Sequence, residues 1–172
     1  GRGAARMTRL VAHGLGVTLP ERWEARIAGP AVSRGVAHAP NAPGARGSAG
    51  ARTFAVLHLA SFPLPEQRDD FGGNFTPSMR SSDAFVSLFE YGPEAALQPL
   101  FSARGVPRVD ARMFSPNRLQ QRRPGQLGCQ LFFNASARAF CLYVVAGSRA
   151  SLPRIVAQVN GALAGLEVEP MP

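Results

Sequence analysis

The apolar and polar positions between residues 126 and 145 follow the period of two that is typical of β-strands. One apolar run ends before Asn134 and a second begins after Ser136, and asparagine tolerates the left-handed backbone of tight turns. The pattern therefore predicts a β-hairpin. We expect the rest of the chain to pack against it.

The length of the hairpin turn decides how the only two cysteines lie. A turn of two or four residues places Cys129 opposite Leu142, whereas a turn of three or five residues places it opposite Cys141, within reach of a cross-strand disulfide. The first register gathers more apolar side chains on one face, namely Leu131, Phe133, Phe140, Leu142 and Val144. We therefore favour it and interpret both cysteines as reduced and buried.

Shorter alternating runs predict further strands. Residues 11–18 and 23–27 flank Leu19-Pro20, which predicts a second hairpin with a proline-started turn and with Trp23 as a core anchor. Residues 54–60 are almost uniformly apolar, which is typical of a central strand that is buried on both faces.

The next predicted strand covers residues 83–91 and divides its large side chains between two faces. Phe85, Phe89 and Tyr91 share one face, and Val86 and Leu88 share the other. Because both faces are apolar, we expect this strand also to lie inside a sheet.

Three proline-containing stretches predict helical segments. Gly92-Pro93-Glu94 favours a short helix over residues 94–104, which Pro99 should break or kink. Ser115 is a candidate cap for a single turn, and Ser151 for a longer helix that ends at Gly165. The expected apolar stripe of the longer helix is formed by Ile155, Val156, Val159 and Leu163. A short edge strand should follow at residues 166–168.

Two long stretches show no periodicity. Residues 29–51 contain almost no large apolar side chain, so we expect a flexible, disordered loop there. Residues 61–82 are rich in proline and glycine and are interpreted as a solvated surface connection. The predicted organisation is an N-terminal tail at residues 1–10 and a single α+β domain at residues 11–170.

Length and composition favour one domain with a substantial core, because the chain has 172 residues of which 45% are hydrophobic. All 19 basic residues are arginine, which indicates the codon usage of a GC-rich, bacterial genome. The net charge of +8 favours acidic partners in general. Arg118, Arg122 and Arg123 form the densest basic cluster and offer nucleic-acid binding as an alternative function, although no aromatic side chain accompanies them.

No apolar run approaches the roughly 20 residues that span a bilayer, and no segment of signal-peptide length is present. These observations predict a soluble, cytoplasmic protein. Because the sequence begins with Gly1 and Met7 is a plausible start, the alternative is a protein of the cell envelope whose N-terminal leader is missing.

His58 is the most conspicuous residue for chemistry, since a histidine in an apolar strand can titrate near neutral pH. We interpret it as a core residue and keep an enzyme or small-molecule pocket as the alternative, with Asp83 or Glu90 as its partner. No other histidine, cysteine or carboxylate stands at ligand spacing from His58, so we predict no metal site and no cofactor.

The order of these elements predicts an antiparallel β-sheet flanked by helices. Residues 16–23, a strand followed by Pro20 and Trp23, and the last helix with residues 165–168 resemble the first and last elements of the PsbP-like α/β/α sandwich. The long loop at residues 29–51 departs from that family. The resemblance implies a non-enzymatic module, such as an accessory subunit, a lipoprotein or a chaperone for secreted toxins.

From that resemblance we expect an adaptor or chaperone that binds another protein. Its partner surface would be an exposed sheet face or groove, with Phe132, Arg138 and Tyr143 as candidate contact residues.

Overall fold

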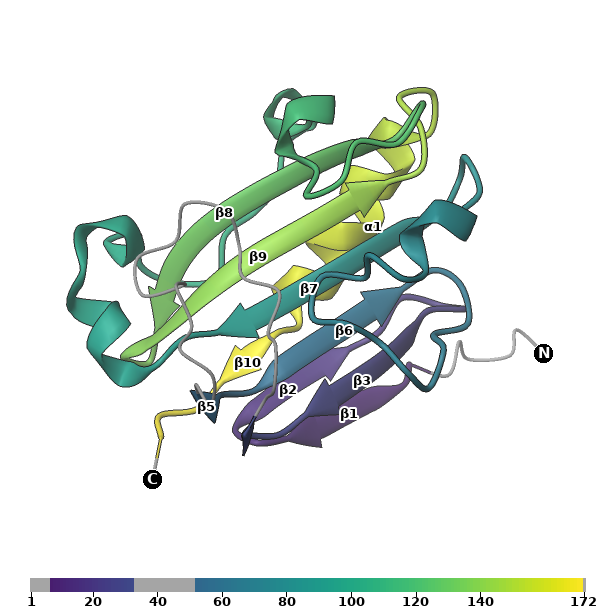
Figure 1. Ribbon diagram of the computed structural model, residues 1–172. Coiled ribbons are helices and arrows are strands. Elements are labelled where there is room, and N and C mark those ends of the chain that lie inside the picture. The colour runs from purple at the N-terminus through teal and green to yellow at the C-terminus, as the bar shows by residue number, and fades with distance from the viewer. Residues whose placement is uncertain (1–6, 33–51, 172) are drawn as a thin grey trace.

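The computed structural model describes residues 7–32 and 52–171 and has an α+β fold (Figure 1). Most of the predicted flexible loop, residues 33–51, and most of the predicted tail, residues 1–6, lie outside the described residues. The described strands pair in an antiparallel manner, and the described residues include one α-helix.

A five-stranded sheet forms the centre of the molecule, with the strand order β3-β6-β7-β9-β8. Its strands are β3 (Glu24–Ala28), β6 (Val56–Ala60), β7 (Ala84–Glu90), β8 (Leu127–Ala135) and β9 (Arg138–Ala146). Both predicted central strands, β6 and β7, are confirmed, and every residue in them is buried.

Two smaller sheets accompany the central one, and the larger of the two joins segments from near both ends of the described chain. β1 (Arg9–Ala12), β2 (Leu15–Thr18) and β10 (Glu167–Val168) form a three-stranded sheet, and β4 (Ala31–Val32) pairs with β5 (Arg52–Thr53). The predicted edge strand near residue 167 is thus confirmed, and it pairs with β2.

The predicted second hairpin with a turn at Pro20 is wrong. The first turn instead falls at His13 and Gly14, whose φ angles are 52° and 72°, and joins β1 to β2. Such backbone angles suit the tight turns of hairpins, whereas the stretch around Pro20 carries the chain out of this sheet into β3, which pairs with β6. Trp23 is buried as predicted.

The organising hairpin is confirmed as β8 and β9, joined by a two-residue turn at Ser136 and Ala137 with φ angles of 51° and 59°. The even register is correct, but Cys129 lies opposite Val144 and not opposite Leu142. The turn falls later than expected because Asn134 is held in the strand by backbone hydrogen bonds with Ala103 and Gly105. Cys129 and Cys141 belong to different hydrophobic clusters on the two sheet faces, and both are free and buried.

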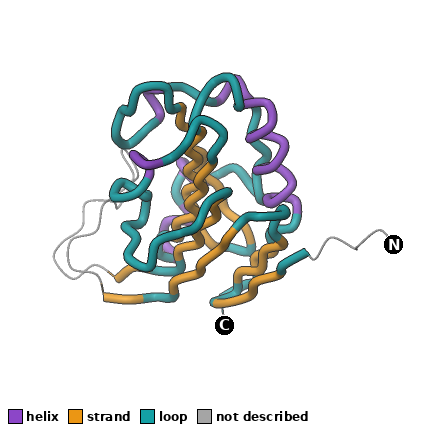
Figure 2. The backbone as a smooth tube through the Cα atoms, turned by 90° about the vertical axis from the view of Figure 1, so that its right-hand side faces the viewer, coloured by secondary structure: helices purple, strands orange, loops and turns teal. Residues whose placement is uncertain are grey.

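One face of the central sheet is covered by α1 (Leu152–Ala164) and by the three-stranded sheet (Figure 2). The predicted helix is confirmed, with Ile155, Val159 and Leu163 buried and Gly165 at its C-cap. Ser151 makes no side-chain cap hydrogen bond; Ser148 Oγ accepts from the Ser151 N–H instead. The largest fully buried side chains on this face are Phe133, Phe140, Leu57, Leu59, Leu88 and Leu142.

The opposite face is covered by loops and short 3₁₀ turns, which corrects the prediction of a solvated connection at residues 61–82. Leu64, Phe71 and Phe75 of this segment are buried, and the ring of Phe71 stacks on that of Phe89 with centroids 5.3 Å apart. These aromatic side chains lack any period, so the pattern along the chain could not reveal that they pack. The sheet therefore separates two hydrophobic clusters.

The predicted helix at residues 94–104 is replaced by two 3₁₀ turns on this loop-covered face, Pro93–Leu97 and Pro99–Phe101. Pro99 interrupts the segment as expected. Three further 3₁₀ turns lie at Thr76–Ser78, Ala111–Met113 and Pro116–Arg118. Ser115 caps the last of these, as predicted, by accepting a hydrogen bond from the Asn117 N–H at 3.2 Å.

Candidate functional site

Arg138, a candidate contact residue, lies at the turn end of the hairpin and is only 2% exposed. Its Nε and one terminal nitrogen donate to the two carboxylate oxygens of Glu90 at 2.6 and 2.9 Å. Its remaining N–H groups donate to the carbonyl oxygens of His13, Gly14 and Glu169 at 2.9 to 3.1 Å. All five guanidinium donors are used inside the chain, so the expectation of an exposed Arg138 is wrong.

Tyr143 is also buried, at 3% exposed, because segments 61–82 and 115–126 cover its face of the sheet. Its hydroxyl accepts a hydrogen bond from the Gln120 N–H at 3.0 Å, and burial raises its pKa. Phe132 is half-buried, with its ring edge-on to that of Phe101. Of the three candidate contact residues, only Phe132 retains part of its surface.

His58 belongs to a row of polar residues that crosses the central sheet at one register. Neighbouring strands pair Arg26 with His58, His58 with Ser87, Ser87 with Tyr143 and Tyr143 with Gln130. On the loop-covered face, side chains of this row can therefore form hydrogen bonds with the loop segment at residues 68–70.

The row holds that segment through the carbonyl oxygen of Asp70. His58 Nε2 lies 2.9 Å from this oxygen, and Ser87 Oγ donates to it at 2.6 Å. Arg68 Nε donates to His58 Nδ1 at 3.2 Å. Because arginine is only a donor, Nδ1 must accept, and the ring proton therefore lies on Nε2. His58 thus acts as a structural link between β6 and residues 68–70.

Burial lowers the pKa of His58 to about 4, so the ring is neutral at pH 7. The structure does not bring His58 together with either predicted carboxylate partner. Asp83 accepts hydrogen bonds from Ser61 Oγ and the Arg80 N–H, and Glu90 is bonded to Arg138. The His58 ring is instead packed 5.3 Å from that of Phe85. This arrangement agrees with the interpretation of His58 as a core residue.

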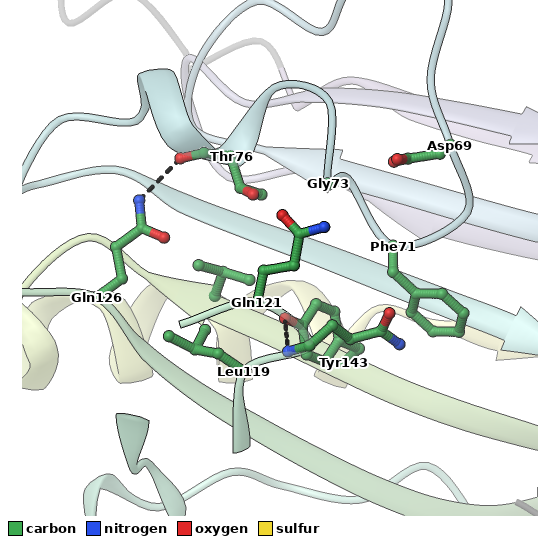
Figure 3. A pocket seen from close by; sticks show the side chains of 10 residues that line it. Asp69, Phe71, Gly73, Thr76, Leu119, Gln121, Gln126 and Tyr143 are labelled. Carbon is green, nitrogen blue, oxygen red and sulfur yellow. Dashed lines mark hydrogen bonds between the residues drawn. The ribbon is translucent and has the colours of Figure 1, made fainter. Parts of the chain in front are cut away.

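A small cavity lies next to this row, between segments 61–82 and 115–126 (Figure 3). Its volume of about 70 Å³ has room for a few water molecules and is well below that of typical small-molecule sites. Gln126 reaches across it to donate to the Thr76 carbonyl oxygen at 2.8 Å, and Gln120 Nε2 is buried and meets no hydrogen-bond partner among the described residues. The cavity therefore offers polar groups but little space.

Both cysteines are free, buried thiols that belong to different hydrophobic clusters. Burial raises the thiol pKa of Cys129 to about 11 and that of Cys141 to about 12, so both remain protonated and weakly nucleophilic. Within residues 7–32 and 52–171, no three His, Cys, Asp or Glu side chains gather as metal ligands would.

The strongest charged feature is a surface that we call the basic end, formed by Arg118, Arg122, Arg123 and Arg149. It lies where β8 begins and β9 ends, beside the start of α1 (Figure 1). Arg122, Arg123 and Arg149 line one open groove of about 580 Å³, together with apolar parts of Pro116, Pro124 and Leu127. Arg118 is exposed in the neighbouring 3₁₀ turn, whose backbone packs on Gly128.

The arginines of the basic end have no carboxylate partner among the described residues. Arg122 and Arg123 donate to the neutral side chains of Asn117 and Gln121 at 2.6 and 3.1 Å. The ion pairs of the described chain lie elsewhere, at Arg9–Glu167, Arg26–Glu24, Arg112–Asp110 and Arg138–Glu90. The basic end thus presents uncompensated positive charge to solvent.

Part of this surface could be recognised in the sequence. The cluster at residues 118–123 was visible as a local run, but Arg149 joins it only because antiparallel pairing brings the end of β9 beside the start of β8. A further signal was present: residues 111–166 contain seven arginines and no aspartate or glutamate. The seven arginines are Arg112, Arg118, Arg122, Arg123, Arg138, Arg149 and Arg154.

Comparison of the chain with family models, with curated proteins and with solved structures finds no match. In the described ranges, no helix combines the length and apolar character needed to cross a membrane. Functional conclusions therefore rest on the geometry of this chain.

Proposed function

We propose that this protein is a non-enzymatic interaction module, an adaptor or chaperone-like accessory subunit, that binds an acidic segment of another protein at the basic end. The observation that carries the proposal is the groove in which Arg122, Arg123 and Arg149 meet without any carboxylate partner among the described residues. Guanidinium groups bind carboxylates with two parallel hydrogen bonds, so such a groove selects for acidic side chains.

The lining of the groove favours a polypeptide over a nucleic acid. Pro116, Pro124 and Leu127 offer apolar contacts between the charges, which suit a chain that mixes acidic and apolar side chains. Binders of single-stranded nucleic acid add aromatic stacking platforms. The large hydrophobic side chains exposed in the described residues are instead Met7, Val11, Leu97, Met113 and Met171. The alternative of nucleic-acid binding through Arg118, Arg122 and Arg123 is therefore an outcome of the test below.

The PsbP-like arrangement and a cytoplasmic location belong to the same proposal. The central antiparallel sheet with α1 on one face supports a PsbP-like sandwich, whereas loops and 3₁₀ turns in place of a second helical layer depart from it. The packed state of His58 and the small adjacent cavity favour binding over catalysis.

The test is the affinity of the purified chain for a fluorescent glutamate-rich peptide, measured by anisotropy, with a single-stranded oligonucleotide as the competing ligand. The double variant Arg122→Glu with Arg123→Glu should lose roughly tenfold or more in peptide affinity. The matched control, Arg22→Glu with Arg108→Glu, changes the net charge equally at exposed sites outside the groove and should lose much less.

Equal losses in the two double variants would show that only the overall charge matters and would overturn the proposed site. Tight binding of the oligonucleotide with a steep salt dependence, and no binding of the peptide, would replace the proposal with nucleic-acid recognition.

A further inference from the structure

The outer edge of β8 is the edge of the central sheet that lies next to the basic end (Figure 1). Two short segments pair with it near its ends. Ser115 exchanges backbone hydrogen bonds of 2.9 and 3.0 Å with Gly128, and Asn134 bonds to Ala103 and Gly105 at 2.8 and 2.7 Å. Even-numbered residues of β8 therefore direct their backbone groups away from β9.

Between these two contacts no described residue pairs with the edge. Because backbone direction alternates along a strand, the N–H and C=O groups of Gln130 and Phe132 point outward like those of Gly128 and Asn134. No hydrogen bond from a described residue reaches these four groups. Gln130, Leu131 and Phe132 each keep part of their surface exposed. An edge of this kind is a template for an added strand.

Charge at the two ends of the opening indicates which strand would fit. Arg118 stands beside Gly128 and Arg104 stands beside Asn134, and both are exposed. Neither forms an ion pair with a described carboxylate. Gly128 and Asn134, whose edge groups are already paired, lie about 20 Å apart along the strand, which leaves room between them for an added segment of about five residues. A second copy of β8 added in antiparallel fashion would place Arg118 of one copy near Arg104 of the other, which like-charge repulsion disfavours.

We infer that an extended acidic segment of a partner protein adds to the sheet as a strand along Gln130–Phe132, with its carboxylates directed at Arg104 and Arg118. This inference rests on the proposed function, because it specifies how the acidic partner of the basic end is held. Backbone hydrogen bonds to the four open groups supply affinity, and the two arginines select acidic side chains. The groove at Arg122 and Arg123 lies next to this end of the opening, because Pro116 and Leu127 line it.

Proline at an outward-facing edge position tests the inference. Gln130→Pro removes one N–H that the added strand requires, whereas proline on an edge strand leaves the pairing with β9 intact. Gln130→Thr is the matched control, because it keeps the N–H and favours strand geometry. With a synthetic peptide of alternating glutamate and threonine as the probe, Gln130→Pro should weaken binding by roughly tenfold, and Gln130→Thr should leave affinity nearly unchanged.

A second measurement uses the unaltered chain, so that it remains decisive if Gln130→Pro fails to fold. Amide hydrogen exchange at Gln130 and Phe132 should be fast in the free protein and should slow when the glutamate–threonine peptide binds. A lysine–threonine peptide should cause no such protection.

The outcomes separate the two proposals. Peptide binding could depend on Arg122 and Arg123 and yet be unchanged in Gln130→Pro, with no protection of the Gln130 and Phe132 amides. That result would overturn strand addition and leave the proposed function intact. Affinity that none of these substitutions changes would overturn both.

Discussion

The two ends of the β8–β9 hairpin both carry arginine but place it in opposite environments. At the turn end, Arg138 is buried and bonds Glu90 and three backbone carbonyl groups. At the open end, Arg122, Arg123 and Arg149 line a groove and meet no carboxylate of the described chain. One end uses its charge to join distant segments, and the other leaves its charge free.

The difference shows that the net charge of a chain says little about function until its partners are known. Arg138 forms hydrogen bonds to β7, to the β1–β2 turn and to the residue after β10, so its positive charge is neutralised inside the fold. A buried ion pair of this kind is costly to break, because removing one partner leaves the other charged and desolvated. The arginines at the basic end form no such ion pair with a described residue, so their guanidinium groups can bind a partner.

Removing the buried arginine should have the largest effect on stability. Arg138→Met should lower the free energy of unfolding by about 3 to 5 kcal/mol, because Glu90 and three carbonyl groups lose their donors. Urea denaturation measures the loss. Arg149→Met, at the opposite end of the same hairpin, serves as the control and should change stability by less than about 0.5 kcal/mol. Similar losses in both variants would contradict the contrast between the two ends.

The buried, neutral His58 should make the protein less stable as the pH falls. Burial holds the folded-state pKa of His58 at about 4, below its ordinary value of 6.5, so the unfolded chain takes up a proton first. Stability should therefore decline as the pH falls from about 6.5 to about 4, by on the order of 3 kcal/mol in total. Denaturation at several pH values measures the decline.

The comparison for His58 is His58→Gln, whose side-chain amide can donate to the Asp70 carbonyl oxygen but cannot titrate. The stability of the unaltered chain should fall more steeply with acid than that of the variant. Parallel curves would show that other groups cause the acid sensitivity.

The second donor to Asp70, the Ser87 hydroxyl, should matter less, because it contributes one neutral hydrogen bond and does not titrate as the pH falls. Ser87→Ala removes the 2.6 Å hydrogen bond to the Asp70 carbonyl oxygen, which His58 still reaches. The expected loss is about 1 kcal/mol in thermal or urea unfolding. Ser102→Ala, at an exposed serine, is the control. A loss no greater than that of the control would mean that the polar row does not hold residues 68–70.

Single substitutions at the basic end should have the smallest effect on the fold. Arg122→Ala removes only a hydrogen bond to Asn117 and should change the unfolding free energy by less than about 0.5 kcal/mol. Differential scanning calorimetry is suitable for this comparison. A loss of several kcal/mol would assign Arg122 a structural role like that of Arg138 and weaken the case for a binding surface.

The sequence predicted those elements whose signal is local. Alternation identified the β8–β9 hairpin and the division of β7 between two faces, because each side chain's direction follows from its neighbours. A short, almost uniformly apolar run identified the central strand β6. The stripe on α1 was recognised for the same reason, since one turn of helix repeats within a few residues.

Features that depend on partners far along the chain could not be predicted in this way. No local pattern indicated that residues 61–82 would cover a sheet face, because Phe71 and Phe75 pack without a period. The turn at His13 was missed because the proline a few residues later is a stronger turn signal in the sequence. The left-handed backbone angles that form the actual turn are seen only in the structure.

The sequence by itself determined the α+β class, the main strands and helix, and an excess of arginine. Only the tertiary structure decided which arginines form internal ion pairs and which meet no carboxylate of the described chain. Arg138 is neutralised by Glu90, 48 residues away, and Arg149 joins Arg122 and Arg123 through strand pairing. Electrostatic roles are set by distance in space and by burial, and a linear chain specifies both only once it has folded.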